Sequence, residues 1–214
     1  LLIEDDAYNG LRYEGMEQPP LKALDTHGLV VYLGSFSKLL FMGLRIGWMH
    51  APREILRQAA IHRQLSDIHA SSVSQWMVQS CLENGLLERH RQRALVENRS
   101  RRNRMLSALQ IHLTDIPGIS WNRPEGGLYI WLTLPRDAAP HKVAAIAGQL
   151  GVAYVPGNVF SVDGSSADSL RLNFTYPSPD QIEEGIRLLG RAIREARKPD
   201  PGLQGAAPVP LAIL

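Results

Sequence analysis

The sequence predicts an α/β protein, with a mostly parallel sheet and helices in its first part and a small α+β domain in its second part. Three observations support this. Short apolar runs rich in β-branched residues end in polar or glycine-containing turns. The segments between several of these runs carry apolar residues at helical spacing. After Pro117-Gly118 the pattern changes to short alternating strands and helices.

Composition is that of an ordinary globular protein. The 214 residues are 44% hydrophobic, and 23 basic and 21 acidic residues give a net charge of +2. This balance predicts neither a nucleic-acid nor a membrane partner. The single cysteine, Cys81, cannot form an internal disulfide, and we find no secretory signal or membrane-length apolar run. We therefore expect a cytoplasmic protein. Because the chain opens inside an apolar run, we also expect the natural chain to begin well upstream.

The first part of the chain is expected to contain three strands and three helices. The run 1–3 reads as a buried parallel strand that opens into the polar segment 4–6, where α/β sheets place ligands. Further strands are expected at 29–33 and 44–49. Helices are expected at 52–66, 72–84 and 87–113, the first starting at Pro52 and the second capped by Gly85.

The second part is expected to alternate strands and helices. The predicted strands are 127–132, 152–155 and 170–174, with a helix over 141–150. Ser178 and Gln181 form a capping box around Pro179, which predicts a helix to about residue 197. We expect a large-domain remainder at 1–90, an interdomain helix with a small domain at 91–198, and a mobile tail at 199–214.

The strongest local signal is the segment 34–38, Gly-Ser-Phe-Ser-Lys, followed by Gly-Leu-Arg-Ile-Gly at 43–47. A lysine amine can form an imine with an aldehyde cofactor, and Lys38 is the candidate. Ser35, backbone N–H groups and Arg45 could hold a phosphate dianion, since arginine offers a planar fork of donors. An isolated turn of this kind would more often be a polar hairpin with an exposed lysine.

The segment Asp5-Asp6-Ala7-Tyr8 favours the cofactor site over the polar hairpin. A buried carboxylate beside a pyridine nitrogen keeps the nitrogen protonated, and a phenol can bond the 3-oxygen of the ring. Asp5 and Tyr8 suit these roles. Asp6 is a rival for Asp5, and a loop or cap carboxylate is the alternative reading of either residue.

The order D-x-A-Y, S-x-S-K and G-x-R-x-G resembles the fold-type I aminotransferases of class I/II, in the 2-aminoadipate aminotransferase-like subgroup. The resemblance covers nearly the whole chain. It implies the carboxy-terminal part of the large domain that binds pyridoxal 5'-phosphate, followed by a small domain. By this resemblance Lys38 is the Schiff-base lysine, Asp5 and Tyr8 contact the ring, and the phosphate ligands are Ser35 and Arg45, with Ser37 as a weaker candidate.

The resemblance also implies the substrates and the assembly. In the segment 169–174, Ser-Leu-Arg-Leu-Asn-Phe, Arg171 matches the arginine that binds the substrate α-carboxylate, although pairing with a surface acid is the alternative. The segment 124–128 matches one that approaches the substrate, and a turn explains its glycines equally well. The expected reaction is ping-pong transfer between an L-amino acid and a 2-oxo acid by a homodimer. The fragment alone is expected to be inactive.

One rival class remains, the effector-sensing domain of a winged-helix transcriptional regulator, whose DNA-binding domain would precede this sequence. Segment 64–72 resembles the free enzymes more closely. Arginines cluster within 89–104, but acidic residues share the segment and no aromatic residues are interleaved, so we expect a solvated helix face rather than a nucleic-acid surface. Scattered histidines and one cysteine predict no metal site.

Overall fold

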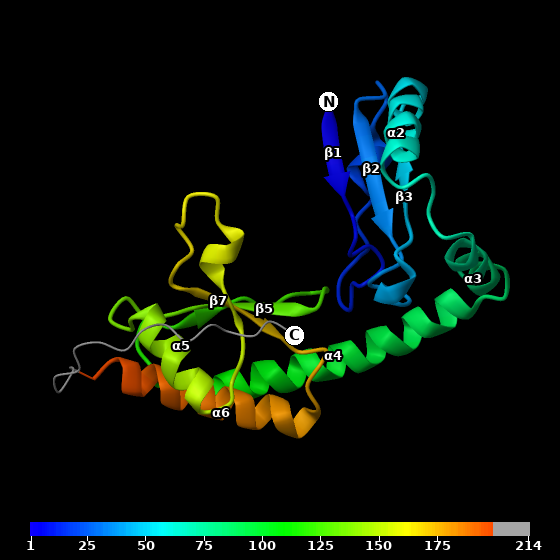
Figure 1. Ribbon diagram of the computed structural model, residues 1–214. Helices are drawn as coiled ribbons and strands as arrows, with labels where there is room; N and C mark the ends of the chain where they lie inside the picture. The colour runs from blue at the N-terminus through cyan, green and yellow to red at the C-terminus, as the bar shows by residue number, and fades with distance from the viewer. Residues whose placement is uncertain (199–214) are drawn as a thin grey trace. The chain divides into compact units, whose positions relative to one another are not determined.

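The computed structural model describes residues 1–198, which form two compact units. Unit 1 contains Leu1–Glu97 together with Glu125–Gly127, and the described part of unit 2 contains Asn98–Pro124 and residues 128–198. The expected tail at 199–214 lies outside the described residues. The α/β fold class is confirmed, since each unit combines a small sheet with helices (Figure 1).

A three-stranded sheet in the order β1-β2-β3 forms the centre of unit 1 (Figure 1). Strand β1 (Leu2–Asp5) runs parallel to β2 (Val30–Ser35), which pairs antiparallel with β3 (Gly47–His50). The strand expected at 44–49 therefore begins later. Residues Met42–Leu44 form the 3-10 helix η1, and Arg45 adopts a left-handed conformation that interrupts the extended chain.

The prediction that the first strand is buried is wrong. Ile3 in β1 is 65% exposed and Leu2 is 44% exposed, whereas Val31 in β2 is only 4% exposed. The difference arises because β1 is an edge strand of the described sheet, with β2 as its one neighbour there. An apolar run shows that a strand suits burial, but it cannot show which other segments cover it.

Helices of unit 1 begin and end close to where the pattern predicts. Helix α2 spans Arg53–Ser66 with Pro52 as its N-cap residue, and α3 spans Ser72–Glu83 with the Ser71 side chain accepting from Ser74 N. Asn84 is the C-cap of α3, and Gly85 follows it at φ +63°. Helix α4 (Leu86–Leu113) contributes to both units. The four-residue α1 (Leu21–Leu24) was not predicted, because one turn is too short for periodicity.

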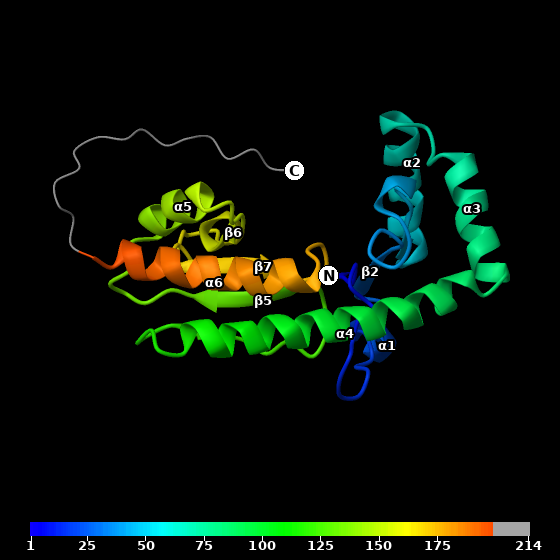
Figure 2. The same cartoon turned by 90° about the horizontal axis from the view of Figure 1, so that it is seen from below.

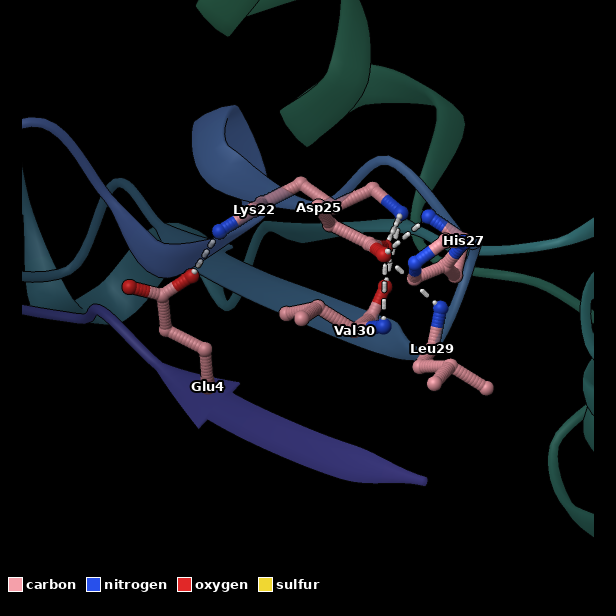
Figure 3. Close-up of polar contacts among 6 residues, drawn as sticks. All are labelled: Glu4, Lys22, Asp25, His27, Leu29 and Val30. Atoms are coloured by element: carbon pink, nitrogen blue, oxygen red, sulfur yellow. Dashed lines mark hydrogen bonds and ion pairs between the residues drawn. The ribbon is translucent and has the colours of Figure 1, made fainter.

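A buried carboxylate fixes the loop that leads into β2 (Figure 3). The Asp25 side chain, only 3% exposed, accepts hydrogen bonds from the backbone N–H groups of Val30 at 2.9 Å and Leu29 at 3.0 Å. The ammonium of Lys22 donates to the same carboxylate at 3.0 Å. These donors favour the charged form, with the Val30 bond contributing most, and they hold the pKa of Asp25 well below its usual range.

Substitution of Asp25 with asparagine should therefore destabilise the chain in a pH-dependent way. A carboxyl whose folded pKa is depressed contributes stability at neutral pH and loses it as the pH falls through and below its unfolded value of 3.8. We expect a lower urea midpoint for Asp25→Asn at pH 7, and a smaller difference from the parent chain at pH 3. Glu54→Gln, at a side chain 83% exposed, is the control. An equal deficit at both pH values would contradict this account.

Unit 2 is built on an antiparallel sheet in the order β4-β5-β7-β6. The strands are β4 (Ser120–Trp121), β5 (Tyr129–Thr133), β6 (Val155–Pro156) and β7 (Ser169–Asn173). The predicted strand at 152–155 is reduced to a two-residue strand, since the 3-10 helix η2 (Gly157–Phe160) begins directly after it. Strand β4 was not predicted, because a two-residue strand has no alternation to detect.

Helices α5 (Pro140–Gln149) and α6 (Pro179–Ala196) pack side by side, as Figures 1 and 2 show. Helix α6 confirms the predicted capping box, with Ser178 and Gln181 exchanging hydrogen bonds around Pro179. Its apolar residues Leu189 and Ile193 are fully buried. The core of unit 2 therefore collects the apolar faces of the sheet strands and of these helices.

The expectation of a solvated arginine face on the long helix is wrong for Arg102. Arg102 is 0% exposed, and its guanidinium donates to the carbonyl of Pro124 at 2.7 Å and to Asn103 Oδ1 at 2.7 Å. Arg101 donates to the carbonyls of Thr175 and Pro177. These arginines serve as hydrogen-bond donors to loop carbonyls of unit 2. Among residues 1–198, no helix combines the length and apolarity needed to cross a membrane.

Candidate functional site

The connection between β2 and β3 carries four of the predicted site residues. Ser35 is the last residue of β2, Ser37 and Lys38 lie in the turn that follows, and Arg45 precedes β3. The ladder continues into this connection, since Phe36 N donates to Ile46 O at 3.1 Å. The four side chains are thus brought to one loop, because the antiparallel pairing of β2 and β3 returns the chain alongside itself.

An aromatic cover anchors the base of this loop. The ring of Trp48 lies over Gly34, where a Cβ atom would approach the indole to 2.2 Å. The Phe36 ring lies 4.7 Å from that of Trp48. Glycine is therefore required at position 34 by the close approach of the indole. The packing fixes the point at which the chain turns toward Lys38.

Arg45 has an unusual backbone. Its φ of 55° places a non-glycine residue in the left-handed region, which costs of order 1–3 kcal/mol. Such conformations concentrate at functional sites. Within residues 1–198 the Arg45 guanidinium has one hydrogen bond, to the carbonyl of Met42 at 3.3 Å, and no carboxylate partner. Its positive charge is therefore available for an anion.

Asp5 and Tyr8 lie beside this loop because β1 and β2 are parallel. Asp5 ends β1 and is in register with Leu33, two residues before the end of β2. The ammonium nitrogen of Lys38 lies 5.8 Å from the centre of the Tyr8 ring. The carboxyl ends of β1 and β2 thus lie at the same edge of the sheet in unit 1, where α/β sheets place ligands, and Lys38 and Tyr8 lie close together there.

The two neighbouring aspartates differ in their partners. Asp6 accepts hydrogen bonds from Asn9 Nδ2 at 2.7 Å and from the Tyr32 hydroxyl at 2.9 Å. Burial, followed by the bond to Asp6, raises the pKa of Tyr32. Asp5 is exposed rather than buried, and it accepts only from Ala7 N at 3.3 Å within the described chain. Asp6 therefore has a structural role, and Asp5 is available for a ligand.

The donors of the loop fit a phosphate-bearing cofactor. Ser35 Oγ accepts from Ser37 N at 3.1 Å, so its hydroxyl proton is available to another oxygen. Together with the hydroxyl of Ser37 and the guanidinium of Arg45, the set contains donors and positive charge without a bonded carboxylate. This is the chemistry that a phosphate dianion requires. For metal ions the set is poor, and in residues 1–198 no three histidine, cysteine or acidic side chains gather.

The segment Glu125–Gly127 docks on the chain that follows Tyr8. Tyr13 N donates to Glu125 O at 2.7 Å, and Gly127 N donates to Leu11 O at 2.9 Å. Arg12 forms an ion pair with Glu125, and the Tyr13 hydroxyl bonds the carbonyl of Gly127. A hollow of about 400 Å³ is lined by Tyr8, Arg12 and both glycines of this segment. Gly126 and Gly127 therefore share a hollow with a predicted site residue.

Gly126 allows this docking because a side chain would not fit. A Cβ atom would lie 2.6 Å from Leu11 O and 2.9 Å from Arg12 Cα. We expect Gly126→Ala to increase the hydrogen-exchange rates of the Tyr13 and Gly127 amides by roughly tenfold or more, because local opening becomes easier. Gly148→Ala is the control, since its Cβ meets nothing within 4 Å; a helical alanine there should stabilise by ~0.5–1 kcal/mol. Unchanged exchange in Gly126→Ala would show that the docking tolerates a side chain.

Arg171 belongs to unit 2, in the middle of β7. Its neighbours Leu170 and Leu172 are 1% and 5% exposed, whereas Arg171 is half-buried on the opposite face. The guanidinium carbon lies 4.1 Å from the centre of the Tyr129 ring and 4.4 Å from that of Phe160. No carboxylate pairs with it among residues 1–198. The alternative reading of a surface ion pair is therefore not supported in the described chain.

Several residues near these groups were not predicted from the sequence. Tyr129 and Phe160 flank Arg171, and Arg12 holds Glu125. Tyr129 had a detectable signal, since an aromatic residue on a strand suits a pleated, half-buried surface. Arg12 and Phe160 had none, because their partners are distant in sequence, and Glu125 was singled out only as part of the segment 124–128.

Comparison with known proteins gives a consistent result. The family model for aminotransferase class I and II matches residues 1–189. An aromatic-amino-acid aminotransferase of Thermococcus litoralis is 38% identical over 92% of this chain and 47% of its own length. A 2-aminoadipate transaminase of Thermus thermophilus is 33% identical over 91% of this chain and 49% of its own length. The chain thus spans about half the length of these relatives.

A solved structure gives the same result. A kynurenine aminotransferase of Pyrococcus horikoshii, solved in complex with PMP, KYN and KYA, superimposes with a TM-score of 0.87 and 40% identity, over 92% of this chain and 48% of that one.

The sequence also matches a transcriptional regulator. An uncharacterised helix-turn-helix transcriptional regulator of Bacillus subtilis is 33% identical over 90% of this chain and 39% of its own length. The match therefore extends to regulators, at lower identity than to the first of the enzymes.

Proposed function

This chain belongs to the class I and II aminotransferases, and from that premise we propose that it holds pyridoxal 5'-phosphate through Lys38 and transfers an amino group. The proposed substrates are an L-amino acid and a 2-oxo acid. The observation that carries the proposal is the gathering of Lys38, Tyr8 and the loop donors at the ends of two parallel strands. These groups suit an aldehyde-bearing pyridine ring with a phosphate.

Lys38 has the central role in this proposal. When bound, pyridoxal phosphate supplies an aldehyde that accepts an amine and a protonated ring that draws electron density from the substrate α-carbon. The amine of Lys38 would provide the covalent attachment to the cofactor, and the same amine, when free, would move the α-proton of the substrate. The chain has four lysines, Lys22, Lys38, Lys142 and Lys198. Lys22 is held by Asp25 and by the carbonyl of Val30.

The other site residues orient the two reactants. Ser35 and Arg45, with Ser37 as an additional donor, would hold the phosphate. Asp5 would keep the ring nitrogen protonated, and the Tyr8 hydroxyl would donate to the 3-oxygen. Arg171 binds the substrate carboxylate with two parallel N–H donors.

The same residues serve both half-reactions, so we propose ping-pong kinetics, in which the first product leaves before the second substrate binds. For the natural protein we also propose a cytoplasmic homodimer. Aromatic, branched and 2-aminoadipate donors are the candidates to be compared.

Covalent trapping tests the proposal directly. The protein is incubated with pyridoxal phosphate, reduced with borohydride, digested and mapped by mass spectrometry. We expect the label on Lys38 and not on Lys22, Lys142 or Lys198. Label that is absent from Lys38, or equally distributed over the four lysines, would overturn the cofactor assignment. Amino transfer is then measured with the donor panel in the longest natural chain that contains this sequence.

A regulator is the second candidate, favoured by the match to the Bacillus subtilis protein. Such a domain would also hold the cofactor at Lys38, so trapping alone does not separate the two functions. Multiple turnover of amino group from donor to 2-oxo acid supports the enzyme. Lys38 labelling without turnover, together with cofactor-dependent binding to DNA upstream of its own gene, supports the regulator.

A further inference from the structure

The surroundings of Arg171 are aromatic. Several exposed arginines of the chain pair with carboxylates, as Arg187 does with Glu184 and Arg191 does with Glu195 at 2.8 Å. Arg171 is instead flanked by Tyr129 from β5 and Phe160 from η2, with no carboxylate partner among residues 1–198. We call these two rings the aromatic bracket.

Packing of the core does not explain Phe160. The side chain is 46% exposed at the end of η2, and its ring contacts are Arg171 at 4.4 Å and the Trp131 ring at 5.8 Å, edge to face. Trp131 is in register with Arg171 across the β5–β7 pair. The Phe160 ring is therefore held at the surface by a cation and a second aromatic ring.

The aromatic bracket and an acidic side chain would affect the ability of Arg171 to bind an anion in opposite ways. A Glu or Asp side chain paired with Arg171 would occupy the N–H donors of the guanidinium. Aromatic rings attract the cation through their faces and leave the in-plane N–H donors free. Arg171 is half-buried, and partial shielding of a guanidinium from water strengthens its attraction to an anion.

We propose that Tyr129 and Phe160 are positioning residues that hold the Arg171 guanidinium for the carboxylate of the substrate. The inference rests on the proposed function, because it assigns Arg171 to the substrate. The rings take the place of an acidic partner, so the arginine is oriented without losing its donors. Neither ring touches the reacting atoms in this account.

Ring currents provide a test that needs no cofactor. In the 214-residue chain, the Nε–Hε resonance of Arg171 is assigned by its loss in Arg171→Lys and is followed by NMR. We expect it to be displaced upfield by the rings, to move toward a solvent-exposed position in Phe160→Leu, and to stay displaced in Phe160→Tyr and Tyr129→Phe. Titration with propanoate as a lone carboxylate should give a dissociation constant roughly three- to tenfold higher in Phe160→Leu.

The natural protein adds a kinetic readout. Phe160→Leu should raise KM for the amino donor by roughly three- to tenfold and leave kcat within about twofold, because ground-state and transition-state binding weaken equally. Tyr176→Ala, which removes a 91% exposed ring of unit 2, is the control and should change neither parameter.

Three outcomes would overturn the inference. They are an Arg171 resonance that is insensitive to Phe160→Leu, an unchanged affinity for propanoate, and a Phe160→Tyr variant as impaired as Phe160→Leu. The proposed function fails separately, if Lys38 is not labelled in the trapping experiment. Because the NMR measurement does not require the cofactor, the two failures can be told apart.

Discussion

Lys38→Ala is expected to abolish amino transfer, lowering kcat by at least about 10⁴-fold. One amine is assigned two tasks, covalent attachment of the cofactor and movement of the α-proton, so its removal affects both. Another lysine is not expected to substitute: Lys22 is bonded to Asp25 at 3.0 Å and to Val30 O at 2.8 Å. Product formation by the natural protein, quantified in single-turnover and steady-state assays, checks the prediction.

Two control variants distinguish the effect of losing the positive charge of Lys38 from the effect of losing its amine. Lys38→Arg keeps a positive charge in the loop but offers no amine for condensation, so we expect it to be as inactive as Lys38→Ala while retaining non-covalent cofactor binding. Lys198→Ala, at an exposed position, should retain wild-type turnover. Substantial turnover by Lys38→Ala, or a borohydride-stable label on that variant at another lysine, would refute the assignment.

Asp5→Asn is expected to lower kcat by roughly 10²–10³-fold, the usual loss when one preorganised electrostatic group is removed. A neutral amide cannot hold the proton on the ring nitrogen, so the ring draws less electron density from the substrate. Asp5 suits this role because its carboxylate has a single 3.3 Å hydrogen bond, from Ala7 N, in residues 1–198.

The adjacent aspartate is the matched comparison. Asp6 bonds Asn9 and Tyr32, so Asp6→Asn should lower the stability of unit 1 while changing kcat much less than Asp5→Asn. Steady-state kinetics and urea unfolding of both variants give the comparison. If Asp6→Asn has the larger effect on kcat, the roles of the two residues must be exchanged.

Local signals were sufficient where neighbouring residues alone determine the structure. The capping box of Ser178 and Gln181 was predicted correctly because both hydrogen bonds lie within one turn of α6. Helices α2 and α3 follow their helical periodicity in the same way, and α4 follows the long charged helical pattern. The lysine turn of the β2–β3 connection was found for a similar reason, since its residue types and spacing carry the family resemblance.

Contacts between segments distant in sequence could not be predicted from these local signals. Exposure of Ile3 depends on what pairs with and covers β1, and burial of Arg102 depends on the carbonyl of Pro124. The difference between Asp5 and Asp6 arises from Tyr32, which lies 26 residues from Asp6. In each case the burial or hydrogen bonding of the residue depends on a partner from another part of the chain. Such a partner cannot be identified from the residues adjacent in sequence.

Periodicity and turn chemistry in the sequence predicted the fold class and the main helices and strands. The family resemblance, carried by the motifs, then pointed to Asp5, Tyr8, Lys38, Arg45 and Arg171 as candidate residues. How these residues are supported became visible in the folded chain. In the fold, Asp6 is hydrogen-bonded to Tyr32, whereas Asp5 has no such side-chain partner among residues 1–198. Glu125–Gly127 is hydrogen-bonded to the chain that follows Tyr8, and two aromatic rings, rather than a carboxylate, lie against Arg171. Hydrogen bonds and ring contacts depend on proximity in space, which strand pairing creates between residues far apart in the chain.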